Sequence, residues 1–157
     1  MQKLIDTNLT FIGKIHTPYE SVDDCPCNIQ QEGPLCKLSV EPQYQGELRG
    51  LKAGSAILIL YWLGKPIDGV GYVALTDENE PGTFAMRTPF RPNPIGVAVV
   101  AIEKMEGNLV YVKGLDCLNG TELLDIKPAI LHEYDASIQR NASLEGCDCD
   151  KPEVSCS

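Results

Sequence analysis

The chain has 157 residues, of which 43% are hydrophobic, and its formal net charge is −9. This length suits one domain with a hydrophobic core, and no apolar run reaches the roughly 20 residues of a membrane span. The acidic balance disfavours a nucleic-acid binder, because phosphate contacts need clustered Lys and Arg. The first residues, MQKLIDTNLTF, lack a signal-peptide pattern, which predicts a cytoplasmic protein.

The first half of the chain predicts short strands separated by Gly and Pro turns. Residues 9–18 alternate in polarity and predict a strand that Pro18 ends, and a long polar loop follows over residues 19–37. Strands are also expected at KLSVEP (37–42) and AILILYWL (56–63), with a turn region at 44–55 between them. Long loops within compact domains often carry function, so the loop at 19–37 is a candidate site.

The second half continues this pattern of strands. A strand is expected at residues 69–75, a hairpin around Glu106–Asn108 from segments 95–107 and 108–116, and a last strand at 120–130 that stops at Pro128. Residues 132–146 predict a short irregular or helical segment. No amphipathic helix, G-x-G-x-x-G or P-loop stands out, which argues against a Rossmann domain.

These elements predict an all-β fold, a small closed or partly open β-barrel, with a sandwich as the alternative. The barrel domain is expected to span residues 1–140. Residues 141–157 are expected to form a short, irregular, cysteine-rich C-terminal tail with no core signal.

The segment RTPFRPNPIG (87–96) places two arginines among three prolines. Each proline holds φ at about −65° and pushes the preceding residue toward extended backbone, so a rigid extended segment is expected. Guanidinium groups bind carboxylates and phosphates through paired hydrogen bonds, and a rigid frame lowers the ordering cost of binding. A proline-rich surface turn with solvated arginines is the alternative.

Three stretches together resemble the TsaA-like (TrmO) family, and the resemblance spans about residues 11–128. They are IGKIHTPY (12–19), FAMRTPFRPNPIGVAVV (84–100) and GNLVYVKGLDCLNGTELLDIKP (107–128). The best-known member of the family is an S-adenosylmethionine-dependent methyltransferase that acts on threonylcarbamoyladenosine in tRNA. The resemblance implies a small β-barrel, a homodimer, and a cofactor site near the subunit interface.

The resemblance also implies a set of residues for binding S-adenosylmethionine. Arg87 is expected to pair with the cofactor carboxylate, and the Asn119–Gly120 turn to approach the adenine or ribose. No catalytic residue is assigned, and a tight turn feeding a core strand is the alternative for residues 118–128. The implied set comprises Pro26, Cys27, Asn28, Leu63, Gly64, Arg87, Val97, Asn119, Gly120, Thr121 and Glu122.

The chain departs from the family pattern around this pocket. Ala56 and Gly64 stand where the family has histidines, and Cys27 stands where it has an arginine. Asn119 and Glu122 replace an aspartate and a proline. The methyl acceptor is therefore expected to be either a modified adenosine of tRNA or a small or metal-linked substrate, and this divergent pocket favours the second.

Six of the seven cysteines form two groups of the pattern C-x-C…C. Reducing compartments disfavour disulfides, and thiolates suit soft metal sites, so a thiolate-bound metal is expected, zinc or an iron–sulfur cluster. This supports a second hypothesis, a non-catalytic metal-binding or metal-sensing module; surface thiols without a ligand are the alternative. The candidate metal ligands are Cys25, Cys27, Cys36, Cys147, Cys149 and Cys156.

Overall fold

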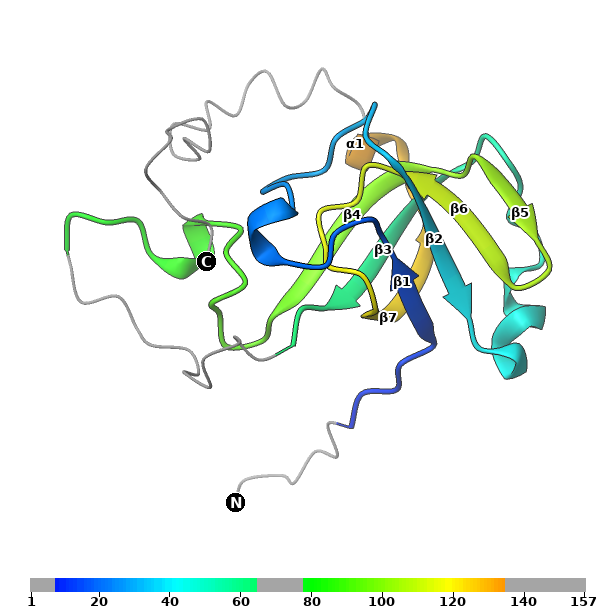
Figure 1. Ribbon diagram of the computed structural model, residues 1–157, viewed down its shortest axis with the longest axis horizontal. Coiled ribbons are helices and arrows are strands. Elements are labelled where there is room, and N and C mark those ends of the chain that lie inside the picture. The colour runs from blue at the N-terminus through cyan, green and yellow to red at the C-terminus, as the bar shows by residue number, and fades with distance from the viewer. Residues whose placement is uncertain (1–7, 65–77, 135–157) are drawn as a thin grey trace.

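The computed structural model describes residues 8–64 and 78–134, which contain one antiparallel sheet of seven strands (Figure 1). In space the strands follow the order β4-β3-β7-β1-β2-β6-β5. The sheet curls so that β4 also lies against β6, but no ladder joins the two edge strands β4 and β5. The predicted all-β, partly open barrel is thereby confirmed. The strands are β1 (Gly13–His16), β2 (Leu35–Val40), β3 (Ala56–Trp62), β4 (Ile95–Ala101), β5 (Lys104–Glu106), β6 (Leu109–Lys113) and β7 (Thr121–Pro128).

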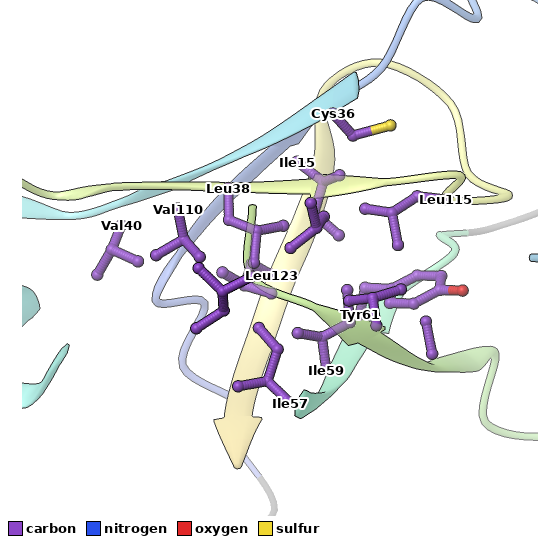
Figure 2. Packing of buried hydrophobic residues seen from close by; sticks show 14 of the residues in the cluster. Ile15, Cys36, Leu38, Val40, Ile57, Ile59, Tyr61, Val110, Leu115 and Leu123 are labelled. Atoms are coloured by element: carbon purple, nitrogen blue, oxygen red, sulfur yellow. The ribbon is translucent and has the colours of Figure 1, made fainter. Parts of the chain in front are cut away.

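The core follows from strict alternation along the strands, because successive side chains point to opposite faces of a sheet. In β3, Ile57, Ile59 and Tyr61 are buried, whereas Leu58 and Leu60 between them face outward and are half-buried. Figure 2 shows the inward set packed with buried side chains from the other strands. The hydroxyl of Tyr61 points away from this packed set, toward one end of the core.

The predicted hairpin at residues 95–116 is only partly correct. β5 and β6 do form a hairpin, but β4 pairs along its length with β3 instead. Between β4 and β5, the buried Ile102 donates its N–H to Ser55 O at 2.9 Å, and Glu103 donates its N–H to Tyr111 O at 2.8 Å. The chain therefore changes neighbour at residues 102–103 and turns around the core.

In the described residues, short helices occupy three of the connections between strands, and one more follows β7. They are the 3-10 helices η1 (Val22–Asp24), η2 (Pro42–Leu48) and η3 (Thr83–Ala85) and the α-helix α1 (Leu131–Tyr134). β1 is shorter than predicted, and β2 begins at Leu35, within the predicted loop. The strand expected at 69–75 and the tail expected at 141–157 lie outside the described residues. Over 8–64 and 78–134, no helix is long and apolar enough to cross a membrane.

Antiparallel pairing brings six strand ends to one edge of the sheet. β1, β3 and β6 end there, and β2, β4 and β7 begin there. The connections at this edge are residues 17–34, 63–64, 78–94 and 114–120, which we call the site edge. In Figure 1 the loop carrying η1, the segment before β4 and the turn before β7 lie on the same side of the sheet.

Candidate functional site

The proline-rich segment at the site edge is bent, not extended as predicted. The side chain of Arg91 folds back, and its Nη1 donates to Met86 O at 3.0 Å and Thr88 O at 3.3 Å. The N–H of Arg91 donates to Pro89 O at 3.0 Å, which tightens the bend. Since the prolines remove backbone donors, a side chain supplies the hydrogen bonds that hold the segment. Arg91 is thus a structural residue of the loop.

Arg87 lies exposed at the base of the same segment, next to β4. Its Nη2 donates to Val97 O at 3.2 Å, so the structure joins two residues of the predicted cofactor set. The described residues give Arg87 no ion pair. A guanidinium has five N–H donors, so most of the donor capacity of Arg87 is available to an anion. The backbone of the segment also holds β3, since Leu63 donates its N–H to Pro94 O at 2.8 Å.

The Asn119–Gly120 turn is fastened to the end of β1. Asn119 Nδ2 donates to Glu20 Oε1 at 2.8 Å, and Gly120 donates its N–H to Ile15 O at 2.8 Å. Gly120 has φ of +85°, a left-handed value that favours glycine, and no heavy atom lies within 4 Å of where its Cβ would be. The turn therefore presents open backbone at the site edge.

Two further contacts bind this turn to β1. Thr17 Oγ1 donates to Cys117 O at 2.8 Å in a buried position. Thr121 opens β7, and the carboxylate of the next residue, Glu122, pairs with Lys14 Nζ at 2.6 Å. The predicted Glu122 is thus already engaged by a lysine on the neighbouring strand.

The cysteine-rich loop docks on the end of β6 through close backbone packing. Gln30 donates its N–H to Gly114 O, and Gly114 donates to Pro34 O, both at 2.9 Å. A Cβ on Gly33 would lie 2.7 Å from the Cα of Gly114, so glycine is needed for this approach. The predicted residues of this loop and of the end of β3 reach the same edge as Arg87: Pro26, Leu63 and Gly64 are half-buried, and Cys27 and Asn28 are exposed.

The thiols of Cys25, Cys36 and Cys117 have raised pKa values. Burial is the first cause, and it raises the pKa of Cys25 to about 11 and that of Cys117 to about 12; burial also raises the pKa of Cys36. Cys36 and Cys117 are each 2% exposed and belong to the hydrophobic core. Burial therefore favours the protonated form of these three thiols.

The predicted thiolate–metal site stays a prediction. Across residues 8–64 and 78–134 no three His, Cys, Asp or Glu side chains gather in a way that could hold a metal ion. The second cysteine group, Cys147, Cys149 and Cys156, lies outside the described residues.

Sequence analysis missed a pair at the centre of the site edge, in which a buried tyrosine meets a half-buried aspartate. Tyr61, 2% exposed, donates its hydroxyl to Asp116 Oδ1 at 2.5 Å. Burial is the main cause that raises the pKa of Asp116, and the hydrogen bond from Tyr61 and the charge of Arg87 lower it in part. The available signal was an aspartate between the apolar Leu115 and Cys117, which is also typical of a turn or capping acid.

Gly96 makes room for this pair. It lies opposite Tyr61 in the β3–β4 ladder, and a Cβ on Gly96 would lie 2.2 Å from Tyr61 Cε2. The ring therefore lies directly on the backbone that follows the proline-rich segment. Asp116, Tyr61, Gly96, Val97 and Arg87 form one continuous series of contacts.

Comparisons with known proteins identify the family of this chain. Residues 14–136 match the family described as tRNA-methyltransferase O N-terminal domain. A Rhizobium radiobacter protein named "Probable S-adenosyl-L-methionine-binding protein VirR" is 44% identical over 124 residues, covering 78% of this chain and 71% of that protein. A Homo sapiens protein named tRNA (adenine(37)-N6)-methyltransferase is 49% identical over 55 residues, 35% of this chain and 12% of that protein.

A solved structure shares the fold. The crystal structure of TrmO from Pseudomonas aeruginosa superposes with a TM-score of 0.70 at 25% identity, covering 89% of this chain and 63% of that one. The chain therefore spans less than two thirds of the length of this TrmO structure.

Proposed function

Since the chain belongs to the tRNA-methyltransferase O N-terminal domain family, we propose that it binds S-adenosylmethionine at the site edge and transfers its methyl group to an acceptor in the cytoplasm. When bound, this cofactor supplies a methyl group on a positively charged sulfonium. The observation that carries the proposal is the position of Arg87. Its guanidinium is held on Val97 O by a braced loop and keeps donors for a carboxylate.

The residues present suit the chemical groups of this cofactor. Arg87 offers paired N–H donors to a carboxylate, which guanidinium groups bind in bidentate fashion. The open backbone at Gly120 allows a flat adenine or a ribose to approach closely. Leu63 and Val97 add apolar surface on either side of the β3–β4 end.

Positioning is the main task of these side chains during methyl transfer. The transfer is an in-line displacement, and holding two reactants in the correct geometry accelerates such a step strongly. The braced segment at 86–94 lowers the ordering cost of binding. Arg87 therefore fixes one end of the cofactor while the fastened turn at 117–121 orders the other.

Titration calorimetry with S-adenosylmethionine tests this proposal. Wild-type protein is expected to bind in the micromolar range, and Arg87→Ala to weaken binding roughly 10- to 100-fold, because a charge-assisted contact is lost. Arg49→Ala is the matched control, since Arg49 is an exposed arginine after η2, away from the site edge. Unchanged affinity in Arg87→Ala would contradict the assignment, and absence of binding to wild-type protein would contradict the function.

Two acceptor classes are proposed, and they make different demands on the surface. The name of the Homo sapiens relative favours a tRNA adenosine. The described surface favours a small acceptor, because four lysines are each paired with a carboxylate and so offer little net attraction to phosphates. Methyl transfer from labelled cofactor to bulk tRNA, compared with transfer to a small-molecule extract, separates the two. Elemental analysis of anaerobically purified protein tests the predicted metal, including a metal-linked acceptor.

A homodimer is proposed from the outer face of β3 and β4. Leu58 lies opposite Val99, and Leu60 lies opposite Val97, with all four side chains half-buried on the outward side. An apolar face of this kind on a soluble domain marks an interaction surface. Because Val97 also accepts the hydrogen bond from Arg87, a partner seated here would lie next to the cofactor site.

A further inference from the structure

The carboxylate of Asp116 lies in a position that a turn or capping role does not explain. Its hydrogen bond from a side chain comes from Tyr61 of β3, a residue 55 positions away. The ring of Tyr61 cannot shift toward β4, since it lies directly on Gly96. The direction of the hydroxyl, and with it the position of Asp116 Oδ1, is therefore determined by the core.

Asp116 and Arg87 form a separated pair of opposite charges. They are linked through Tyr61, Gly96 and Val97, and the charge of Arg87 lowers the pKa of Asp116. Yet the ion pairs formed by the described residues do not include them. Two opposite charges that are close without pairing leave each free for a ligand that carries the complementary charges.

We propose that Asp116, oriented by Tyr61, binds the α-ammonium group of S-adenosylmethionine, while Arg87 binds its carboxylate. The amino-acid end of this cofactor carries both charges on one carbon, so a separated Asp–Arg pair matches it. This inference rests on the proposed function and adds an anionic binding residue, with Tyr61 as a positioning residue, to that site.

Three ligands distinguish the role of Asp116 by calorimetry. S-adenosylmethionine and S-adenosylhomocysteine both carry the ammonium and carboxylate, whereas 5′-methylthioadenosine lacks both. Asp116→Asn is expected to weaken binding of the first two roughly 10- to 100-fold and to leave the third unchanged, because one charge-assisted contact is lost. Asp125→Asn, on the far part of β7 where its carboxylate pairs with Lys127, is the matched control.

The positioning role of Tyr61 has its own readout. Tyr61→Phe keeps the ring but removes the hydrogen bond that lowers the pKa of Asp116. When the pH is lowered, the variant is expected to lose affinity for S-adenosylmethionine at a higher pH than the wild-type protein does, because the carboxyl group of Asp116 is protonated earlier. The thiols that face Asp116 do not account for this shift, because burial raises the pKa of Cys25 to about 11 and that of Cys117 to about 12, so both stay protonated throughout the acidic range.

The outcomes of these titrations that would overturn the proposal can be told apart. Equal weakening of all three ligands in Asp116→Asn would mean a structural role, and weakening of S-adenosylmethionine alone would mean a contact with the sulfonium; both overturn the proposal. Unchanged binding in Asp116→Asn, with wild-type affinity intact, overturns it while leaving the proposed function standing. Wild-type protein that binds none of the ligands overturns both. Far-ultraviolet circular dichroism of each variant confirms folding.

Discussion

Gly96 controls the packing of the buried tyrosine at the centre of the site. A methyl group in Gly96→Ala would lie 2.2 Å from Cε2 of Tyr61, whose ring is 2% exposed and has no room to move. Overpacking of a core of this kind costs about 1–3 kcal/mol. We expect a decrease of this size in the free energy of unfolding, measured by urea denaturation, together with weaker binding of S-adenosylmethionine.

Gly46→Ala is the control for this substitution. Gly46 lies in η2, and no heavy atom lies within 4 Å of where its Cβ would be. Its φ is not positive, so alanine is tolerated there and the free energy of unfolding should change by less than about 0.5 kcal/mol. Similar effects of the two substitutions would show that contact with Tyr61 is not what limits position 96.

Asp116 is expected to cost stability at neutral pH. Burial raises the pKa of Asp116 in the folded protein above its usual value of 3.8. Between these two pKa values the folded state binds more protons than the unfolded state, so stability falls as pH rises through this window, and the loss persists above it. Asp116→Asn should therefore unfold at a higher temperature than wild-type protein near pH 7.

The pH dependence distinguishes this effect from a general change in packing. The difference in melting temperature between Asp116→Asn and wild-type protein should shrink as pH falls and vanish below about pH 3.8, where the carboxyl group is protonated in both states. A difference that stays constant with pH would rule out the charge of Asp116 as its cause.

Sequence analysis named those residues of the candidate site that lie in a motif, and missed those that depend on packing. Arg87 and Val97 follow from the motif at 84–100, and the structure places them in contact. Tyr61 lies within the strand predicted at 56–63, and Asp116 ends the segment predicted at 108–116, but neither was named as a site residue. Their pairing across 55 positions depends on the β3–β4 register and on Gly96, which the sequence does not show.

At the scale of elements, Arg91 determines the shape of the loop before β4. Arg91→Leu removes the guanidinium group whose Nη1 donates hydrogen bonds to Met86 O and Thr88 O. We expect faster amide hydrogen exchange in residues 86–95 and several-fold weaker binding of S-adenosylmethionine, because the loop must then be ordered on binding. The global free energy of unfolding should change by less than about 1 kcal/mol, since the loop lies outside the core.

Arg49→Leu is the matched control for the loop experiment. It removes an exposed arginine next to η2 and should change neither hydrogen exchange at 86–95 nor binding. If Arg91→Leu behaves like this control, the bend is held by its prolines alone.

Most strands were predictable because their alternation is strong, as in β3, where every second residue is buried. The division between β4 and β5 was not, since no glycine or proline separates residues 95–101 from residues 104–106 at the point where the chain changes neighbour. That division is determined by long-range contacts, namely the hydrogen bond from Ile102 to Ser55 and the one from Glu103 to Tyr111. The bend at 86–94 depends instead on a local contact, in which the side chain of Arg91 returns to the backbone of its own segment.

At the scale of the whole molecule, the outer face of β3 and β4 should control assembly. The double variant Leu58→Lys/Val99→Lys places two charges on this face without changing the proposed cofactor residues. We expect wild-type protein to sediment as a dimer and the variant as a monomer, because burying unpaired lysines is costly. The measurement is sedimentation equilibrium over a range of concentrations.

Leu35→Lys is the control for assembly. Leu35 is 50% exposed at the start of β2, away from β3 and β4. This variant should remain dimeric. A wild-type monomer, or a double variant that stays dimeric, would contradict the proposed interface.

The position of β7 between β1 and β3 has a consequence for how the protein is made. The contacts that join Lys14 to Glu122 and Thr17 to Cys117 span 108 and 100 residues. During synthesis the first strand is finished long before residues 121–128 emerge from the ribosome, so the sheet cannot be completed until late in translation. Non-local pairing of this kind slows folding. A nascent chain that stops before Thr121 leaves the facing edges of β1 and β3 unpaired, and such edges template association with other chains.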